Sequence, residues 1–121
     1  YMVRVTADPV RPRAILLARY PCPDLSAPKR RPIVVVAIPA ERSDDFIALP
    51  LTSKPNGVCE VLVRDSDPAF PSSGLRVTSA IKWSKPMTLS SVVAQRRLGE
   101  LDRSVFADAV GRLLASLRSS A

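Results

Sequence analysis

Short apolar runs separated by proline-rich segments make up most of the chain. Twelve prolines stand against four glycines in 121 residues, and proline interrupts both helices and sheet ladders. The run Ile33 to Ile38 (IVVVAI) is almost continuous in β-branched residues, which is typical of a strand buried on both faces. The pattern predicts a fold of short strands over most of the length.

Further runs have the composition or the alternation of strands. They are residues 13–20, 45–52, 58–64, 75–83 and 87–90. Pro50 lies inside one of these runs and predicts a bulge or an edge position. Asn56 and Gly57 predict a hairpin turn that leads into the following strand. The segments predicted to be loops are 21–31, which is basic, and 65–73, which is rich in proline and serine.

The last part of the chain changes to a helical period. Its apolar residues follow one another at alternating spacings of one and three, which predicts an amphipathic helix with a core-facing stripe. They are Val105, Phe106, Ala109, Val110, Leu113, Leu114 and Leu117. Asp102 is the predicted N-cap, and Asp108 is expected to pair with Arg112. Short strands followed by one helix predict a small antiparallel sheet or barrel closed by the helix. We expect one domain over 1–121, with 1–12 as a poorly ordered extension.

Composition excludes several kinds of site. The chain has no histidine, so it cannot hold a Ser-His-Asp triad, a Cys-His pair or a histidine metal ligand. Cys22 and Cys59 are too few for a disulfide framework and fit no metal spacing, and no carboxylate cluster suits Mg²⁺. We therefore expect no metal and no cofactor. No run is long enough to cross a bilayer, and without a signal peptide the expected compartment is the cytoplasm.

The net charge is +7, and 14 of the 18 basic residues are arginines. The planar guanidinium suits phosphate, and the excess charge indicates a polyanionic partner. A cationic surface that only keeps the protein in solution gives the same charge, so charge alone does not separate the two interpretations.

Three segments carry the candidate functional groups. KRRP at 29–32 directly precedes the buried run, and its proline favours an extended Arg31 at the entrance of a strand. PLTSKP at 50–55 ends another strand with two hydroxyls and an ammonium, and IKWSKP at 81–86 holds an aromatic ring between two cations. The side chains are Lys29, Arg30, Arg31, Thr52, Ser53, Lys54, Lys82, Trp83 and Lys85.

Each candidate also has a structural interpretation. Arg31 can be a solvated loop cation, and Thr52 can serve as a turn or cap residue. Trp83 either stacks on an unpaired base or lies half-buried in a barrel or dimer interface. Arg96 and Arg97 either extend a groove that follows a nucleic-acid backbone or solvate a turn, and the second interpretation is favoured.

The order of these segments resembles the MazF/PemK endoribonuclease toxins of bacterial toxin–antitoxin systems. The resemblance covers about Arg13 to Leu117 and is carried by YPCPDLS, KRRPIVVVA, DFIALPLTSKP, GLRVTSAIKWSKPMTL and QRRLGELD. Each piece is weak alone, but their order is fairly specific, and TSK and RRLG favour the PemK-like branch. Arg13-Ala14-Ile15 stands where the family usually has Gly-Asp-Ile, and the loop after the first strand lacks the usual glycine. Both departures concern the geometry of the first turn.

The resemblance implies an SH3-like barrel with a packed helix, working as a homodimer that a cognate antitoxin inhibits with an acidic, disordered segment. It also implies cleavage of single-stranded RNA by attack of the ribose 2′-hydroxyl. Arg31 and Thr52 match the family's cleavage residues, and the remaining candidates would bind RNA. Arg31 would stabilise the charged transition state and could pass a proton to the leaving oxygen, although its pKa makes it a poor acid. Thr52 would orient a phosphate oxygen or the attacking hydroxyl.

Two other functions stay open at this point. One is a non-enzymatic poison of DNA gyrase, as in CcdB relatives that share this fold and act through their last residues, which include an aromatic. This chain ends in LRSSA, which disfavours it. The other is a nucleic-acid-binding module that has lost catalysis, which would bind RNA with a steep salt dependence and never cut it.

Overall fold

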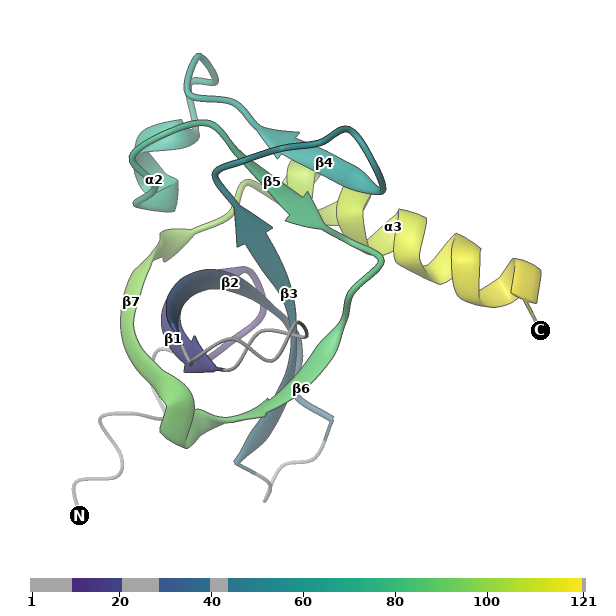
Figure 1. Ribbon diagram of the computed structural model, residues 1–121, viewed down its shortest axis with the longest axis horizontal. Helices are drawn as coiled ribbons and strands as arrows, with labels where there is room; N and C mark the ends of the chain where they lie inside the picture. Colours follow the sequence, from purple (N-terminus) through teal and green to yellow (C-terminus); the bar gives the residue numbers. More distant parts are fainter. Residues whose placement is uncertain (1–9, 21–28, 40–43, 121) are drawn as a thin grey trace.

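A computed structural model describes residues 10–20, 29–39 and 44–120. Its strands curl into a barrel-like antiparallel sheet, and a long helix extends away from the sheet at the end of the chain (Figure 1). The elements are β1 (Ala14–Tyr20), β2 (Lys29–Ala37), β3 (Asp45–Thr52), β4 (Glu60–Val63), α2 (Phe70–Ser73), β5 (Ser79–Lys82), β6 (Met87–Ser90), the 3-10 turn η1 (Ser91–Val93), β7 (Ala94–Glu100) and α3 (Arg103–Ser120). The predicted mainly β fold with a C-terminal helix is confirmed. Residues 1–9 of the expected extension and Cys22 lie outside the described residues.

Strand β3 organises the sheet. The strand order is β4-β5-β3-β2-β1-β7, and β6 also pairs with β3. One side of β3 pairs with β2, while the other side pairs first with β6, through Ala48, and then with β5, from Leu51. Pro50 lies between these two partners, where a missing N–H breaks no ladder. This gap in pairing replaces the bulge or edge that the sequence predicted.

Alternate residues of the central strands fill two core clusters. Val34 and Leu49 belong to the cluster that also contacts α3, while Val35 and Ala48 belong to the other. Ile33, Val34 and Val35 are each 0% exposed, which confirms the prediction of a strand buried on both faces. The strand ends at Ala37, so Ile38 lies beyond it and is exposed.

The strand β2 begins earlier than the apolar run. Lys29, Arg30 and Arg31 pair with Tyr20, Arg19 and Ala18 of β1. The expectation that 29–31 belong to a loop was therefore wrong, because backbone pairing with β1 extends the strand through charged residues. Residues 21–28 of that predicted loop lie outside the described part of the chain.

Other differences concern the second half of the chain. The sequence did not predict β7, whose one large apolar residue is Leu98 and which pairs with β1 through its backbone. Gly57 does turn, with a φ of 80°, but β4 pairs with β5 and not with β3, so the predicted hairpin is absent. Of the strand predicted at 75–83, only β5 forms. The predicted loop 65–73 contains the short helix α2, because Phe70 packs on the core.

Helix α3 begins at the predicted cap. The Asp102 carboxylate accepts hydrogen bonds from the backbone N–H groups of Ser104 (3.1 Å) and Val105 (3.4 Å), and the Ser104 hydroxyl also donates to it. On the polar side Arg112 Nε lies 2.8 Å from Asp108 Oδ1, as predicted. Among the described residues, no helix is both long and apolar enough to span a membrane.

The apolar stripe of α3 is only partly in the core. Its N-terminal half packs on the sheet through Phe106 and Ala109, but Leu114 and Leu117 are 45% and 58% exposed. The expectation that the whole stripe is core was wrong, because the helix runs past the edge of the sheet (Figure 1).

Candidate functional site

A cleft of about 680 Å³ lies where β2 begins and β3 ends. The described residues that line it include six cations and no carboxylate. The lining side chains and backbone come from Leu17, Lys29, Arg30, Arg31, Pro32, Leu51, Thr52, Ser53, Lys54, Gly74, Leu75, Arg76, Val77, Ser79, Arg96 and Leu98. Such a concentration of one sign of charge in a concave surface favours a polyanionic ligand.

Arg31 and Thr52 meet in this cleft, although 20 residues separate them in the sequence. The register between β2 and β3 places Ile33 opposite Pro50. The pairing ends there, and the same register continued by two residues would place Arg31 opposite Thr52. Because both residues line the cleft, the neighbouring ends of the two strands bring them to one surface.

The Arg31 guanidinium has an unsatisfied donor. Its Nε is buried, and it has no hydrogen-bond partner among the described residues. Leaving a buried donor unpaired costs about 1–3 kcal/mol, and such groups in native structures call for an explanation. Since the Nε itself is closed to the cleft, a ligand oxygen there would meet the guanidinium at its Nη groups.

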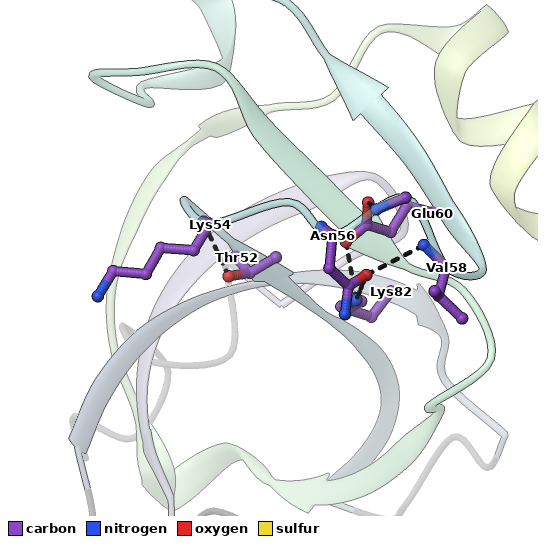
Figure 2. A network of polar contacts seen from close by, with 7 residues as sticks. Thr52, Lys54, Asn56, Val58, Glu60 and Lys82 are labelled. Atoms are coloured by element: carbon purple, nitrogen blue, oxygen red, sulfur yellow. Dashed lines mark hydrogen bonds and ion pairs between the residues drawn. The ribbon is translucent and has the colours of Figure 1, made fainter.

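The Thr52 hydroxyl accepts one hydrogen bond and can still donate one. The backbone N–H of Lys54 donates to Thr52 Oγ1 at 3.1 Å. A hydroxyl that accepts one hydrogen bond can still donate its own, so the Thr52 O–H can point to a ligand. Ser53 and Lys54 are exposed and also line the cleft, and in Figure 2 the Lys54 side chain extends away from the neighbouring polar network.

That network holds the segment after β3 in place. The Glu60 carboxylate accepts from the backbone N–H groups of Asn56 (3.0 Å) and Gly57 (2.7 Å). Lys82 Nζ lies 2.7 Å from Glu60 Oε2 and donates to Asn56 Oδ1 at 2.8 Å. The Asn56 oxygen also accepts from the N–H of Val58 at 3.0 Å, and Figure 2 shows these contacts converging. The loop that carries Ser53 and Lys54 is therefore tied to β4 and β5.

The third predicted segment lies outside the cleft lining. Lys82 is bound to Glu60, whose side chain is only 4% exposed. Trp83 is half-buried and packs against the core cluster that contacts α3, as in its structural interpretation. Lys85 is exposed and is not among the described lining residues. The structure thus brings together the candidates of the first two segments, without the third.

Part of the cleft was not predicted from the sequence. Arg76 and Ser79 lie in a segment predicted to be a strand without functional residues, and both line the cleft. Arg96 lines it as well, although the favoured interpretation was a solvated turn. Arg96 could have been identified if its strand had been predicted, but the sequence of β7 is too polar to indicate a strand. The part of the chain that the structure describes contains no group of three or more His, Cys, Asp or Glu side chains that could hold a metal.

The network around Glu60 predicts a pH dependence of stability. The hydrogen bond from Lys82, followed by the one from the backbone of Asn56, holds the pKa of Glu60 below its ordinary value of 4.5. A carboxylate with a lowered folded-state pKa contributes stability that is fully present above the unfolded-state value. This contribution is lost as the pH falls through the folded-state value.

We therefore expect Glu60→Gln to lose less stability than the wild type on acidification below about pH 4.5. Denaturant unfolding at a series of pH values measures this difference. Lys82→Met should flatten the profile in the same way, while Lys85→Met, at an exposed lysine, should not. A Glu60→Gln profile parallel to the wild type would show that the network does not couple to folding.

Comparisons with known proteins agree with this fold. A family model described as a PemK-like, MazF-like toxin of type II toxin–antitoxin system matches residues 11–117. No curated protein sequence matches the chain. The toxin MazF-mt6 of Mycobacterium tuberculosis is similar in structure, with a TM-score of 0.61 and 22% identity over 85% of this chain and 97% of that one.

Two further solved structures are similar. MazF from Deinococcus radiodurans has a TM-score of 0.68 and 23% identity, and the match covers 89% of this chain and 96% of that one. An endoribonuclease in complex with its cognate antitoxin, from a mycobacterial species, has a TM-score of 0.59 and 18% identity over 88% and 91% of the two chains. At these identities the likeness shows the fold, and it confirms the expected fold class.

Proposed function

Because the chain belongs to the family of PemK-like, MazF-like toxins of type II toxin–antitoxin systems, we propose that it is an endoribonuclease that cuts single-stranded RNA at short specific sequences without a metal ion. The observation that carries the proposal is the cleft that Arg31 and Thr52 share, whose described lining has six cations and no carboxylate. One solved structure that shares the fold is itself described as an endoribonuclease.

The proposed reaction is a transesterification within the RNA. The ribose 2′-hydroxyl gives up its proton to water as its oxygen attacks the adjacent phosphorus in line. The bond from phosphorus to the 5′-oxygen breaks, and that oxygen takes a proton from water, so the products end in a 2′,3′-cyclic phosphate and a 5′-hydroxyl. Negative charge accumulates on the phosphate oxygens in the transition state. Arg31 donates two hydrogen bonds to these oxygens. Donors that are already in place stabilise the charge of the transition state more than that of the ground state.

Thr52 positions the phosphate beside Arg31. Its hydroxyl accepts from the Lys54 N–H and can still donate its own proton to a ligand oxygen in the cleft. Arg31 acts by charge and hydrogen bonding. Lys29, Arg30, Ser53 and Lys54, which share the cleft, are assigned to binding the RNA backbone.

We assign the chain two protein partners, a second copy of itself and an antitoxin. Similar chains have been solved with MazE and with a cognate antitoxin. An antitoxin segment rich in carboxylates and disordered when free would complement the cations of the cleft and block RNA. The expected compartment is the cytoplasm, where messenger RNA is available.

Cleavage of a long RNA in the presence of EDTA tests the proposal. Primer extension on the treated RNA is expected to give discrete stops at one recurring short sequence. An intact RNA under all conditions would contradict the proposal. Inhibition of gyrase supercoiling without any RNA cleavage would establish the poison instead.

A further inference from the structure

Two arginines of the cleft have no role in the reaction described above. Arg76 follows α2 and Arg96 lies on β7, so neither belongs to the strands that carry Arg31 and Thr52. Both side chains are exposed, and neither forms an ion pair with any described residue. Cations left unpaired at the wall of a concave surface are available to a ligand.

The backbone brings Arg76 and Arg96 to the same wall. Gly74 adopts a left-handed conformation, with a φ of 74°, and a Cβ atom at this position would lie 2.0 Å from the carbonyl oxygen of Leu98. The segment after α2 therefore lies directly against β7. Arg76 and Arg96 are each two residues from this contact along their own segments, so they flank it.

This wall stands apart from the reacting pair. Arg96 lies opposite Leu17 on β1, and Leu17 lies opposite Pro32 on β2. Neighbouring strands are about 4.8 Å apart, so β7 is separated from β2 by about 10 Å. The cleft is thus lined by cations from two separate parts of the sheet, β2 and β7, and Leu17 of β1, the strand between them, also lines it.

We propose that Arg76 and Arg96 form a second phosphate-binding site, which holds the backbone of the RNA at a nucleotide flanking the cleaved bond. This inference rests on the proposed function and specifies its substrate as an oligonucleotide that spans both walls of the cleft. Two guanidinium groups on one phosphate position the strand without reading a base, since phosphate contacts carry no sequence information directly.

The neighbouring Arg97 provides a matched control. Arg97 carries the same charge as Arg96 and lies on the same strand, β7. It is not among the described residues that line the cleft. Its Nη2 lies 3.6 Å from Glu100 Oε2. A loss of affinity that came only from lower net charge would appear equally in Arg96→Ala and Arg97→Ala.

Binding of uncleavable oligonucleotides tests the site. 2′-O-methyl oligouridines of about three and about ten nucleotides lack the attacking hydroxyl, and fluorescence anisotropy over a range of salt gives their affinities. For the longer probe, each lost phosphate contact lowers the slope of log affinity against log salt by about 0.7. Because the two arginines hold one phosphate, we expect the double variant Arg76→Ala/Arg96→Ala to lower that slope by about 0.7. We also expect it to reduce the ratio of the affinities for the longer and the shorter probe by about tenfold.

Arg97→Ala should keep the wild-type salt slope and the length advantage, which is the higher affinity for the longer probe. Circular dichroism should show that each variant is folded. Arg96→Gln, which keeps a polar side chain on β7, serves as a second variant and should lose about half of the double variant's slope change. The inference is overturned if the wild type shows no length advantage, if the double variant keeps it, or if Arg97→Ala loses as much.

The same experiments separate this inference from the proposed function. If the wild type cuts RNA but the double variant binds the long probe normally, the second phosphate site is wrong and the endoribonuclease stands. If RNA is never cut but the length advantage depends on Arg76 and Arg96, the phosphate site stands and the endoribonuclease is wrong.

Discussion

Replacing Arg31 with alanine is expected to lower the rate of RNA cleavage by about two to three orders of magnitude. The substitution removes the only guanidinium of the described residues that is both buried at Nε and without a partner. Because no protein group accepts from that Nε, its removal should leave the free energy of unfolding unchanged or slightly higher. Cleavage rates, together with denaturant unfolding, measure both effects in one variant.

Two further variants define what the arginine supplies. Arg31→Lys keeps the charge but loses the planar fork, so most of the activity should still be lost. Arg118→Ala, at the exposed end of α3, removes one charge far along the helix and should cut RNA at the wild-type rate. An Arg31→Ala variant that cuts RNA at the wild-type rate, or that loses activity only because it unfolds, would remove Arg31 from the mechanism.

Gly74→Ala is expected to destabilise the protein by about 3 kcal/mol or more, at the upper end of single substitutions. Two costs act together. A non-glycine residue in the left-handed conformation costs about 1–2 kcal/mol. In addition, the new Cβ would lie 2.0 Å from Leu98 O and 2.5 Å from Leu98 C, which are backbone atoms of β7. Either α2 or β7 must move, so the wall of the cleft that carries Arg76 and Arg96 would change as well.

Two other glycines separate these costs. Gly57 has a φ of 80°, and a Cβ added there would have nothing within 4 Å. Gly57→Ala should therefore lose only the conformational cost of about 1–2 kcal/mol in stability. Gly111 lies within α3 with nothing within 4 Å, and Gly111→Ala should stabilise the protein by up to about 1 kcal/mol. Thermal unfolding orders the three variants, and a Gly74→Ala no less stable than Gly57→Ala would contradict the close packing of α2 on β7.

The parts of the fold that local patterns specify agree with the sequence prediction. The bounds of β3 were predicted correctly, because its residues 46–51 are apolar and lie between the polar Asp45 and Thr52. The cap of α3 at Asp102 was also predicted correctly, since a carboxylate before a helical stripe has a defined local role. Strand β7 could not be predicted, because its pairing with β1 depends on backbone hydrogen bonds and its side chains show little pattern.

In the site, too, local patterns were predictable and long-range pairing was not. Its residue types were visible in the sequence, but the meeting of Arg31 and Thr52 depends on the register between β2 and β3. The sequence grouped Lys82 with the RNA-binding residues because of its neighbours Trp83 and Lys85. The structure pairs Lys82 with Glu60, a carboxylate 22 positions earlier whose partner no local pattern specifies.

The end groups of the RNA fragments test the central claim most directly. The wild-type protein is incubated with RNA in EDTA, and the fragments are analysed by mass spectrometry. Attack by the ribose hydroxyl beside Arg31 and Thr52 predicts 2′,3′-cyclic phosphate and 5′-hydroxyl ends. Fragments with 3′-hydroxyl and 5′-phosphate ends, or cleavage that requires an added divalent ion, would contradict it.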